Sequence, residues 1–459
     1  MNSYKLHKRI AYLIFYSLLL SLLFSIYLTN KYDKYESNTS VHSMVKGDSY
    51  PIWKRAEKFK KDLDSKKDYL SSGSEMHRSY LPLRIVAFFS MISGYELFSE
   101  QDTTKINIGK KKILYLVFQT FIYFQILFFF LKKLQNYLDK DSLYYCALFL
   151  CLCPSIILFH SSFHTESIFF SLQLLFLFYI VDPSPKILIN IFYGLLLGLM
   201  FLQKTISLLY IFLIISFLIF NFKNKSLKPI IVMSLSYIFI LCFVGYGNFK
   251  RIGVFYFMPT QSSNAPYHYL SKPIMSKGMK ISTIEASLKI KKDSDLWLKK
   301  NNINLNSEVD RLTFYKYQKK YATNLINEYP IIFIKHATWK SFQTAMINPL
   351  YVLHYFYWEQ EKDKEFYKTK KYKMIWHPIN IIYSITIYIL VLIGFIRSFN
   401  ILDLKLNYLF ITSGLYMFAM AAWVGHDRYM LPSLIYLAIY FGIGTMTIKK
   451  KIKNFKICK

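Results

Sequence analysis

Residues 187–222 read ILINIFYGLLLGLMFLQKTISLLYIFLIISFLIFNF, and Lys204 is the one charged residue in this stretch. A helix needs about 20 mostly apolar residues to cross the roughly 30 Å hydrocarbon core of a bilayer. The stretch is therefore long enough for two membrane spans, with Gln203 and Lys204 at the turn that joins them. We predict a transmembrane helical hairpin here, because a soluble domain could not bury so long an apolar sequence.

The rest of the chain is also rich in apolar residues. It has 459 residues, of which 54% are hydrophobic and 19% aromatic. Inside lipid every backbone amide needs an internal partner, so apolar runs of this length must be helices. We predict an all-α membrane protein with about 10–11 transmembrane helices. The predicted spans are residues 10–28, 113–131, 143–160, 165–181, 187–203, 205–222, 229–247, 378–397, 406–424 and 429–448.

The charge pattern places the chain relative to the bilayer. The formal net charge is +31, and the basic residues gather at the ends of apolar runs, as at Lys223, Lys225 and Lys228. This is the positive-inside pattern of membrane proteins. A nucleic-acid-binding protein would carry its basic face on a folded soluble domain, so we expect the lipid bilayer and no nucleic acid as a partner. We predict a multi-pass protein of the cytoplasmic (inner) membrane of a bacterium.

Two polar stretches divide the chain into five regions. Each stretch contains an apolar piece mixed with charges, residues 81–98 and 331–353, which we predict to be interfacial helices. Placing the basic end of the chain in the cytoplasm puts both stretches outside. The regions are a first anchor at 1–29, an external loop at 30–112, a helix bundle at 113–247, a large external loop at 248–377, and C-terminal spans with a basic cytoplasmic tail at 378–459.

The segment 81–98 decides whether two acidic residues share a compartment. If it crosses the membrane, Asp48 and Glu166 lie on opposite sides. Lys110, Lys111 and Lys112 favour crossing. Arg84 at its start and a short apolar core favour a segment that does not cross.

Asp48 and Glu166 are the acidic candidates for chemistry. Asp48 has no basic neighbour in the first loop, and Glu166 lies at the mouth of an apolar helix. Carboxylates in such places can act as a general base or hold a metal ion. Each also has a purely structural explanation: Asp48 can cap a helix that starts at Pro51, and Glu166 suits the positive end of its helix dipole.

Lys204 and Arg428 are the basic candidates. A lysine binds phosphate as a point charge, and an arginine binds it through two parallel hydrogen bonds. The structural alternatives are a lysine that extends to the lipid headgroups and an internal ion pair between Asp427 and Arg428. If residues 81–98 do not cross, as we expect, the alternation of spans puts both acids and both cations on one side of the membrane, and we predict that they share a site.

In the order of these elements, the chain resembles the GT-C superfamily of polyprenyl-phosphate-dependent membrane glycosyltransferases, in particular its bacterial protein-mannosyltransferase-like and ArnT-like group. Asp48 resembles the acidic residue after the first span of that family. The other matching residues are Pro154, Glu166 and Ser167, then Gly194, Gly198 and Lys204, then Arg311, Ala322, Ile326 and Pro330, and finally Arg428, Tyr429 and Pro432. The sequence departs from the family in two places: Asp48 has no second acidic neighbour, and Thr205 rather than proline follows Lys204.

This resemblance implies that a sugar is transferred from a polyprenyl-phosphate donor to a lipid, glycan or protein acceptor on the external face. Asp48 would be the base, Glu166 would orient the acceptor, and Lys204 and Arg428 would hold the phosphate. A divalent cation at Asp48 and Glu166 would be compatible with it, and no other cofactor is implied. The further candidates for substrate binding are His77, Arg78, Arg84, His164 and His426.

Two other classes of function stay open. A polymerase or ligase of cell-envelope glycans shares the many-helix plan, but such proteins depend on arginines in their external loops, and residues 248–377 contain just Arg251 and Arg311. A transporter or flippase predicts ionisable residues at mid-membrane depth, whereas the charges here fall at the ends of the spans. The sequence therefore favours a glycosyltransferase.

Overall fold

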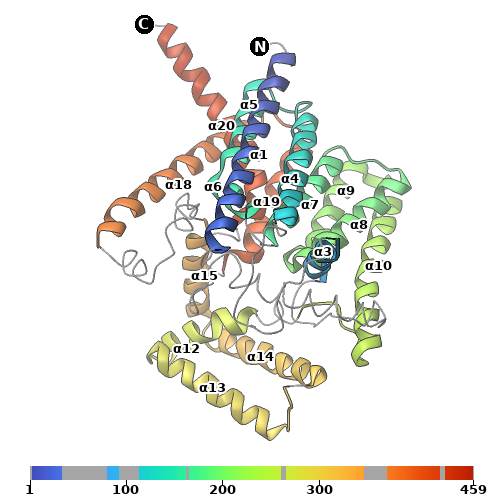
Figure 1. Cartoon of the computed structure of the whole chain (residues 1–459), viewed down its shortest axis with the longest axis vertical. Coiled ribbons are helices and arrows are strands. Elements are labelled where there is room, and N and C mark those ends of the chain that lie inside the picture. Colours follow the sequence, from blue (N-terminus) through green and yellow to red (C-terminus); the bar gives the residue numbers. More distant parts are fainter. Residues whose placement is uncertain are drawn as a thin grey trace.

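The structure is a computed structural model that describes residues 3–33, 80–92, 113–161, 165–259, 265–305, 307–345, 370–423 and 430–457. These ranges form helices and contain no strand (Figure 1), which confirms the predicted all-α class. Six helices among them are long and apolar enough to cross a membrane. Their apolar spans are Leu6–Ile26, Leu114–Leu134, Thr205–Phe222, Leu227–Ile252, Ile381–Ser398 and Leu431–Phe455.

The helices form a bundle and a smaller unit beyond one end of it (Figure 1). The bundle consists of α1 (Ser3–Asp33), α4 (Ile113–Leu134), α5 (Lys140–Leu152), α6 (Pro154–His160), α7 (Glu166–Ile180), α8 (Ile187–Gln203), α9 (Tyr210–Phe222), α10 (Leu227–Ile252), α18 (Lys370–Ser398), α19 (Leu404–Ala422) and α20 (Leu431–Ile457). The smaller unit consists of η4 (Tyr267–Ser271), α12 (Lys272–Gly278), α13 (Thr283–Lys300), α14 (Glu308–Glu328) and α15 (Pro330–Ala345). Helix α3 (Tyr80–Ile92) packs beside α8 and α4.

The long apolar helices in the described ranges are fewer than the spans that we predicted. The predicted span 143–160 is two helices, because Pro154 cannot continue a helix and holds Cys153 in extended geometry at ψ 118. Helices α7 and α8 have 15 and 17 residues, or about 23 and 26 Å, less than the roughly 30 Å of hydrocarbon. Helix α19 overlaps the predicted span 406–424 from residue 406 to residue 422 but is not among the six.

Close backbone contacts hold the bundle together. A Cβ atom on Gly394 of α18 would lie 1.7 Å from the carbonyl oxygen of Tyr440 in α20. One on Gly444 would lie 1.9 Å from the carbonyl oxygen of Leu390. Helices in lipid associate through such small residues, because burial of apolar surface gives little driving force there. Glycine is therefore required where α18 and α20 cross.

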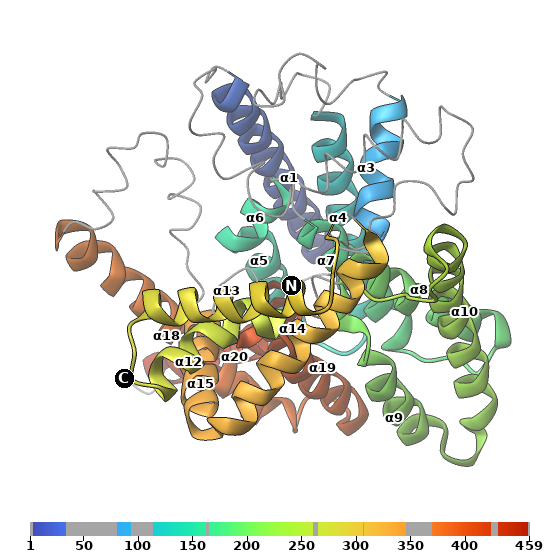
Figure 2. The same ribbon diagram turned by 90° about the horizontal axis from the view of Figure 1, so that it is seen from below.

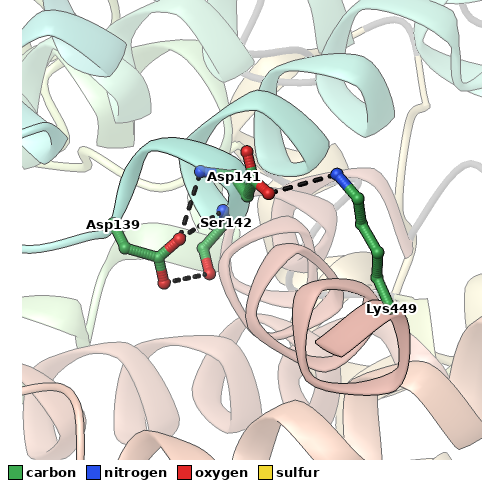
Figure 3. Close-up of polar contacts among 4 residues, drawn as sticks. All are labelled: Asp139, Asp141, Ser142 and Lys449. Atoms are coloured by element: carbon green, nitrogen blue, oxygen red, sulfur yellow. Dashed lines mark hydrogen bonds and ion pairs between the residues drawn. The ribbon is translucent and has the colours of Figure 1, made fainter. Parts of the chain in front are cut away.

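Polar contacts define the two ends of the bundle. At the end that we call the basic end, Lys133 pairs with Asp182 at 2.9 Å and Lys449 pairs with Asp141 at 3.1 Å. Figure 3 shows the second pair, beside the Asp139 carboxylate that caps α5. The opposite end carries His160, Ser161, Thr165, Glu166, Gln203 and Lys204, and we call it the site end.

The connection between α1 and α4 starts and finishes at the site end. Ser161 donates a hydrogen bond to the carbonyl of Ser21, late in α1, at 3.0 Å. Thr120, early in α4, donates to the carbonyl of His160 at 3.0 Å. Helix α3, with 13 residues or about 20 Å, is too short for a span.

The smaller unit lies beyond the site end and has its own apolar core (Figures 1 and 2). That core consists of Leu270, Ile274, Met275, Ala286, Ile290 and Leu325. Ser282 and Glu285 form a capping box at the start of α13, which satisfies the amides that open the helix. Trp423, after α19, packs against this core. The unit is thus attached to the bundle near the residues that we predicted to be functional.

Candidate functional site

Glu166 is the first residue of α7, and its side chain is 4% exposed. Thr165 precedes it in helical geometry without capping the helix. Instead, the Thr165 hydroxyl donates to Glu166 Oε2 at 3.3 Å. Glu166 therefore lies at the positive end of the helix dipole, as the structural explanation requires, but a specific partner engages it as well.

That partner is Lys204, which follows the last residue of α8. The chain turns extended at Lys204, with φ −148 and ψ 124, and its amide closes α8 on the carbonyl of Met200. This turn directs the ammonium to Glu166, and Lys204 Nζ lies 2.9 Å from Glu166 Oε1. The lysine side chain is 12% exposed, so it does not extend to the lipid headgroups as the structural alternative predicted.

The ion pair is held by its neighbours. Gln203, 1% exposed, donates to the carbonyl of Thr165 at 2.9 Å and so ties the end of α8 to the start of α7. Ser207 donates to the carbonyl of Lys204 at 2.9 Å. A buried ion pair usually stabilises a fold no more than an apolar pair of similar size would. Such a pair at a helix end is therefore a functional candidate.

A second polar cluster, next to Glu166, was not among the residues predicted from the sequence. His160 Nδ1 and Ser167 Oγ share a hydrogen bond at 2.6 Å, and the His160 ring stacks on Tyr123 with centroids 3.7 Å apart. Gln119 and Thr120 of α4 both donate to the His160 carbonyl. A histidine at the end of an apolar run was the available signal. The cluster fixes the first turn of α7, which carries Glu166.

Tyr416 of α19 and Tyr210 of α9 hold the turn that follows Lys204. The Tyr416 hydroxyl donates to the carbonyl of Ile206 at 2.6 Å and accepts the amide of Leu209 at 3.1 Å. Tyr210, which opens α9, donates to Ser413 of α19 at 2.8 Å. The position of Lys204 therefore depends on the packing of α9 and α19 as well as on α8.

The start of α20 is attached to α7 by a buried glutamine. Gln173 donates to the carbonyl of Pro432 at 2.8 Å and to the hydroxyl of Tyr436 at 3.0 Å. The Tyr436 and Tyr210 hydroxyls lie 3.1 Å apart and share a hydrogen bond. One polar network thus connects the helices that carry Glu166 and Lys204 with the hairpin of α19 and α20.

The structure brings together two of the predicted site residues, Glu166 and Lys204, and describes a third, Arg84. Arg84 is 8% exposed in α3. The remaining candidates fall outside the described residues, and their roles stay predictions. They are Asp48, His77, Arg78, His164, His426 and Arg428.

A divalent cation held by Asp48 and Glu166, which the resemblance allows, stays a possibility, because Asp48 lies outside the described residues. No group of three or more metal-ligating side chains occurs within the described ranges. Glu166 is the one predicted ligand among them, and its carboxylate is already paired with the Lys204 ammonium. A second cation at this carboxylate would be repelled by that ammonium. We therefore derive no chemical step from a metal ion.

No family model and no curated protein matches this chain. Among solved structures, it is similar to the archaeal oligosaccharyltransferase AglB from Archaeoglobus fulgidus in complex with an inhibitory peptide and a dolichol-phosphate. The identity is 10%, the overlap covers 98% of this chain and 52% of that chain, and the TM-score is 0.45. For the Archaeoglobus fulgidus oligosaccharyltransferase in its apo form, the identity is 11%, the coverage 97% and 51%, and the TM-score 0.47.

The chain spans about half the length of these solved neighbours. A likeness of this degree assigns no activity to the chain, so its function rests on the residues of the site.

Proposed function

We propose that this protein is a membrane glycosyltransferase that moves a sugar from a polyprenyl-phosphate donor to an acceptor hydroxyl at the site end. The observation that carries the proposal is the buried ion pair of Glu166 and Lys204, 2.9 Å apart. It supplies a cation for a phosphate and a carboxylate for a hydroxyl within one hydrogen-bond length. These are the two groups that such a transfer needs.

The depth of the pair suits a lipid-linked donor. Helices α7 and α8 are short, so their ends at Glu166 and Lys204 are recessed relative to a full span of about 30 Å. The phosphate of a polyprenyl donor lies where its lipid tail meets the headgroups. A lysine at this depth can reach that phosphate while the tail stays in the hydrocarbon.

Lys204 would bind the donor phosphate as a point charge. An ammonium carries three N–H donors, so the Lys204 ammonium, which pairs with Glu166, can also donate to a phosphate oxygen. As the bond from the sugar to the phosphate breaks, negative charge grows on that oxygen, and Lys204 stabilises it. The same phosphate weakens the hold of Lys204 on Glu166, because the two anions compete for one cation.

Glu166 would then orient the acceptor hydroxyl, and Asp48 is the proposed base. In the transfer, the acceptor oxygen forms a bond to the anomeric carbon and the bond from that carbon to the phosphate oxygen breaks. The hydroxyl proton goes to the carboxylate of the base, and the polyprenyl phosphate leaves with the bonding electrons. The sugar and the acceptor depend on the shape of the cavity around these residues.

The test is turnover of a polyprenyl-phosphate-linked sugar in membranes that contain the wild-type protein, Asp48→Asn or Asp182→Asn. We expect Asp48→Asn to reduce transfer by at least about a hundredfold, the usual contribution of a general base. Asp182→Asn is the matched control, because Asp182 is 63% exposed at the basic end and pairs with Lys133. Full transfer by Asp48→Asn would remove that residue as the base.

A donor that moves across the membrane unchanged would contradict the proposal as a whole and would instead indicate a flippase. A product in which donor sugars are joined into a chain would indicate the polymerase. Both outcomes can be read in the same assay from the products.

A further inference from the structure

The last turns of α20 extend beyond the basic end of the bundle (Figure 1). Helix α20 has 27 residues, or about 40 Å, whereas the hydrocarbon core is about 30 Å thick. Lys449 marks where the helix leaves the bundle, because it pairs with Asp141 in the first turn of α5 at 3.1 Å (Figure 3). It also lies over the ring of Tyr145, 5.6 Å from its centroid.

The residues that follow Lys449 combine charge with exposed apolar groups. Lys450, Lys451 and Lys453 are exposed, and no acidic residue occurs from 449 to 459. Ile452 is 53% exposed and Phe455 67% exposed. Since they are three residues apart, both lie on the same face of the helix.

The height of this segment matches the headgroup layer. Residues 450 to 455 rise about 9 Å past Lys449, and the polar layer of a bilayer is about 5–8 Å thick on each side. A helix that leaves the hydrocarbon at Lys449 passes through the phosphates of the surrounding lipids. The lysines then lie at the depth of those phosphates, and Ile452 and Phe455 can turn back toward the acyl chains.

We infer that residues 450–455 of α20 bind anionic phospholipid headgroups, and that this contact orders the end of α20 on the membrane surface. The choice of partner follows from the position and the charge: the segment continues a membrane-spanning helix, and each basic residue near an anionic leaflet adds to the attraction. Asp141 and Tyr145 hold the base of the segment, so its direction relative to the bilayer is fixed.

The test measures chymotryptic cleavage after Phe455 in the full-length protein, reconstituted in nanodiscs. One set contains phosphatidylcholine alone and the other also contains about 30% phosphatidylglycerol. We expect cleavage after Phe455 to be at least about fivefold slower with the anionic lipid, the factor that one basic residue near such a surface contributes. Cleavage after Trp339, 57% exposed in α15, is the internal control and should not change.

The variant Lys450→Gln/Lys451→Gln/Lys453→Gln separates charge from fold. It should lose the protection in anionic nanodiscs, while the cleavage rate at Trp339 stays that of the wild type. Equal cleavage after Phe455 in both lipid mixtures would overturn the inference, as would equal protection in the triple variant. Protection that appears in neutral nanodiscs only after RNA is added would assign the segment to nucleic acid instead.

Discussion

The buried ion pair makes a quantitative prediction about stability. Lys204→Met leaves the Glu166 carboxylate, 4% exposed, without its cation. Removing one partner of a buried pair costs about 3–5 kcal/mol, because the other charge stays buried and uncompensated. Replacing both partners by neutral groups of similar size is often nearly neutral. The double variant Glu166→Gln/Lys204→Met should therefore be more stable than Lys204→Met, despite carrying one more substitution.

The assay is unfolding of the purified protein in mixed micelles, followed by tryptophan fluorescence over a titration with denaturing detergent. Glu166→Gln, Lys204→Met and the double variant form a double-mutant cycle. We expect a coupling free energy of at least about 3–5 kcal/mol, because the double variant should lose little stability while Lys204→Met alone loses that much. The pair of Lys133 and Asp182 is the matched control. Its side chains are 25% and 63% exposed, so its coupling should stay below about 1 kcal/mol.

The reasoning would be refuted if the double variant were no more stable than Lys204→Met. Equal coupling in the two pairs would also contradict it, because burial would then have no effect on the interaction.

Three further predictions concern packing, hydrogen bonding and pH. Gly394→Ala places a Cβ atom 1.7 Å from a facing carbonyl oxygen and should destabilise the protein by about 1–3 kcal/mol or more in the same titration. Gly414→Ala, whose Cβ atom would have its nearest contact at 3.2 Å, should destabilise the protein less. Tyr416→Phe removes both hydrogen bonds to the turn that follows α8 and should lower the free energy of unfolding by about 1–3 kcal/mol. Tyr408→Phe, which loses a single hydrogen bond to a serine hydroxyl, is the control and should lower it less. Burial, together with two nearby lysines, lowers the pKa of His336, so its neutral form is favoured in the folded state. Its contribution to the free energy of unfolding should be complete above the unfolded pKa of about 6.5 and should be lost as the pH falls below that value. His336→Gln should flatten this part of a plot of melting temperature against pH. An unchanged plot would contradict the assignment of this pH dependence to His336.

The architecture could be predicted because apolar runs and their charged ends are local properties. The stretch 187–222 gave two helices with Lys204 between them, as its pattern indicates. The break at Pro154 was also available from the sequence, since proline cannot continue a helix. The apolar run across it was nevertheless long enough to be taken for one span. The lengths of α7 and α8 depend on where packing ends each helix, which hydropathy alone does not determine.

The site could be predicted only in part, because its contacts depend on how the helices pack. Counting spans put Glu166 and Lys204 on one side of the membrane, but their contact depends on how α7 and α8 pack. The tyrosines that hold the turn after Lys204 come from α9 and α19, and Tyr416 of α19 lies more than 200 residues away along the chain. Such contacts between distant helices leave no local pattern, so Tyr416 could not be recognised as a neighbour of the site.

The central claim is that the pair of Glu166 and Lys204 serves sugar transfer and not stability alone. The most direct measurement is the rate of sugar transfer from a polyprenyl-phosphate donor by purified wild-type protein and by Glu166→Gln/Lys204→Met in the same lipid. Because the double variant should keep near-native stability, a loss of activity cannot come from unfolding. The account predicts that the double variant loses at least about a hundredfold in rate while its unfolding midpoint stays close to that of the wild type. Transfer at the wild-type rate by the double variant would contradict it.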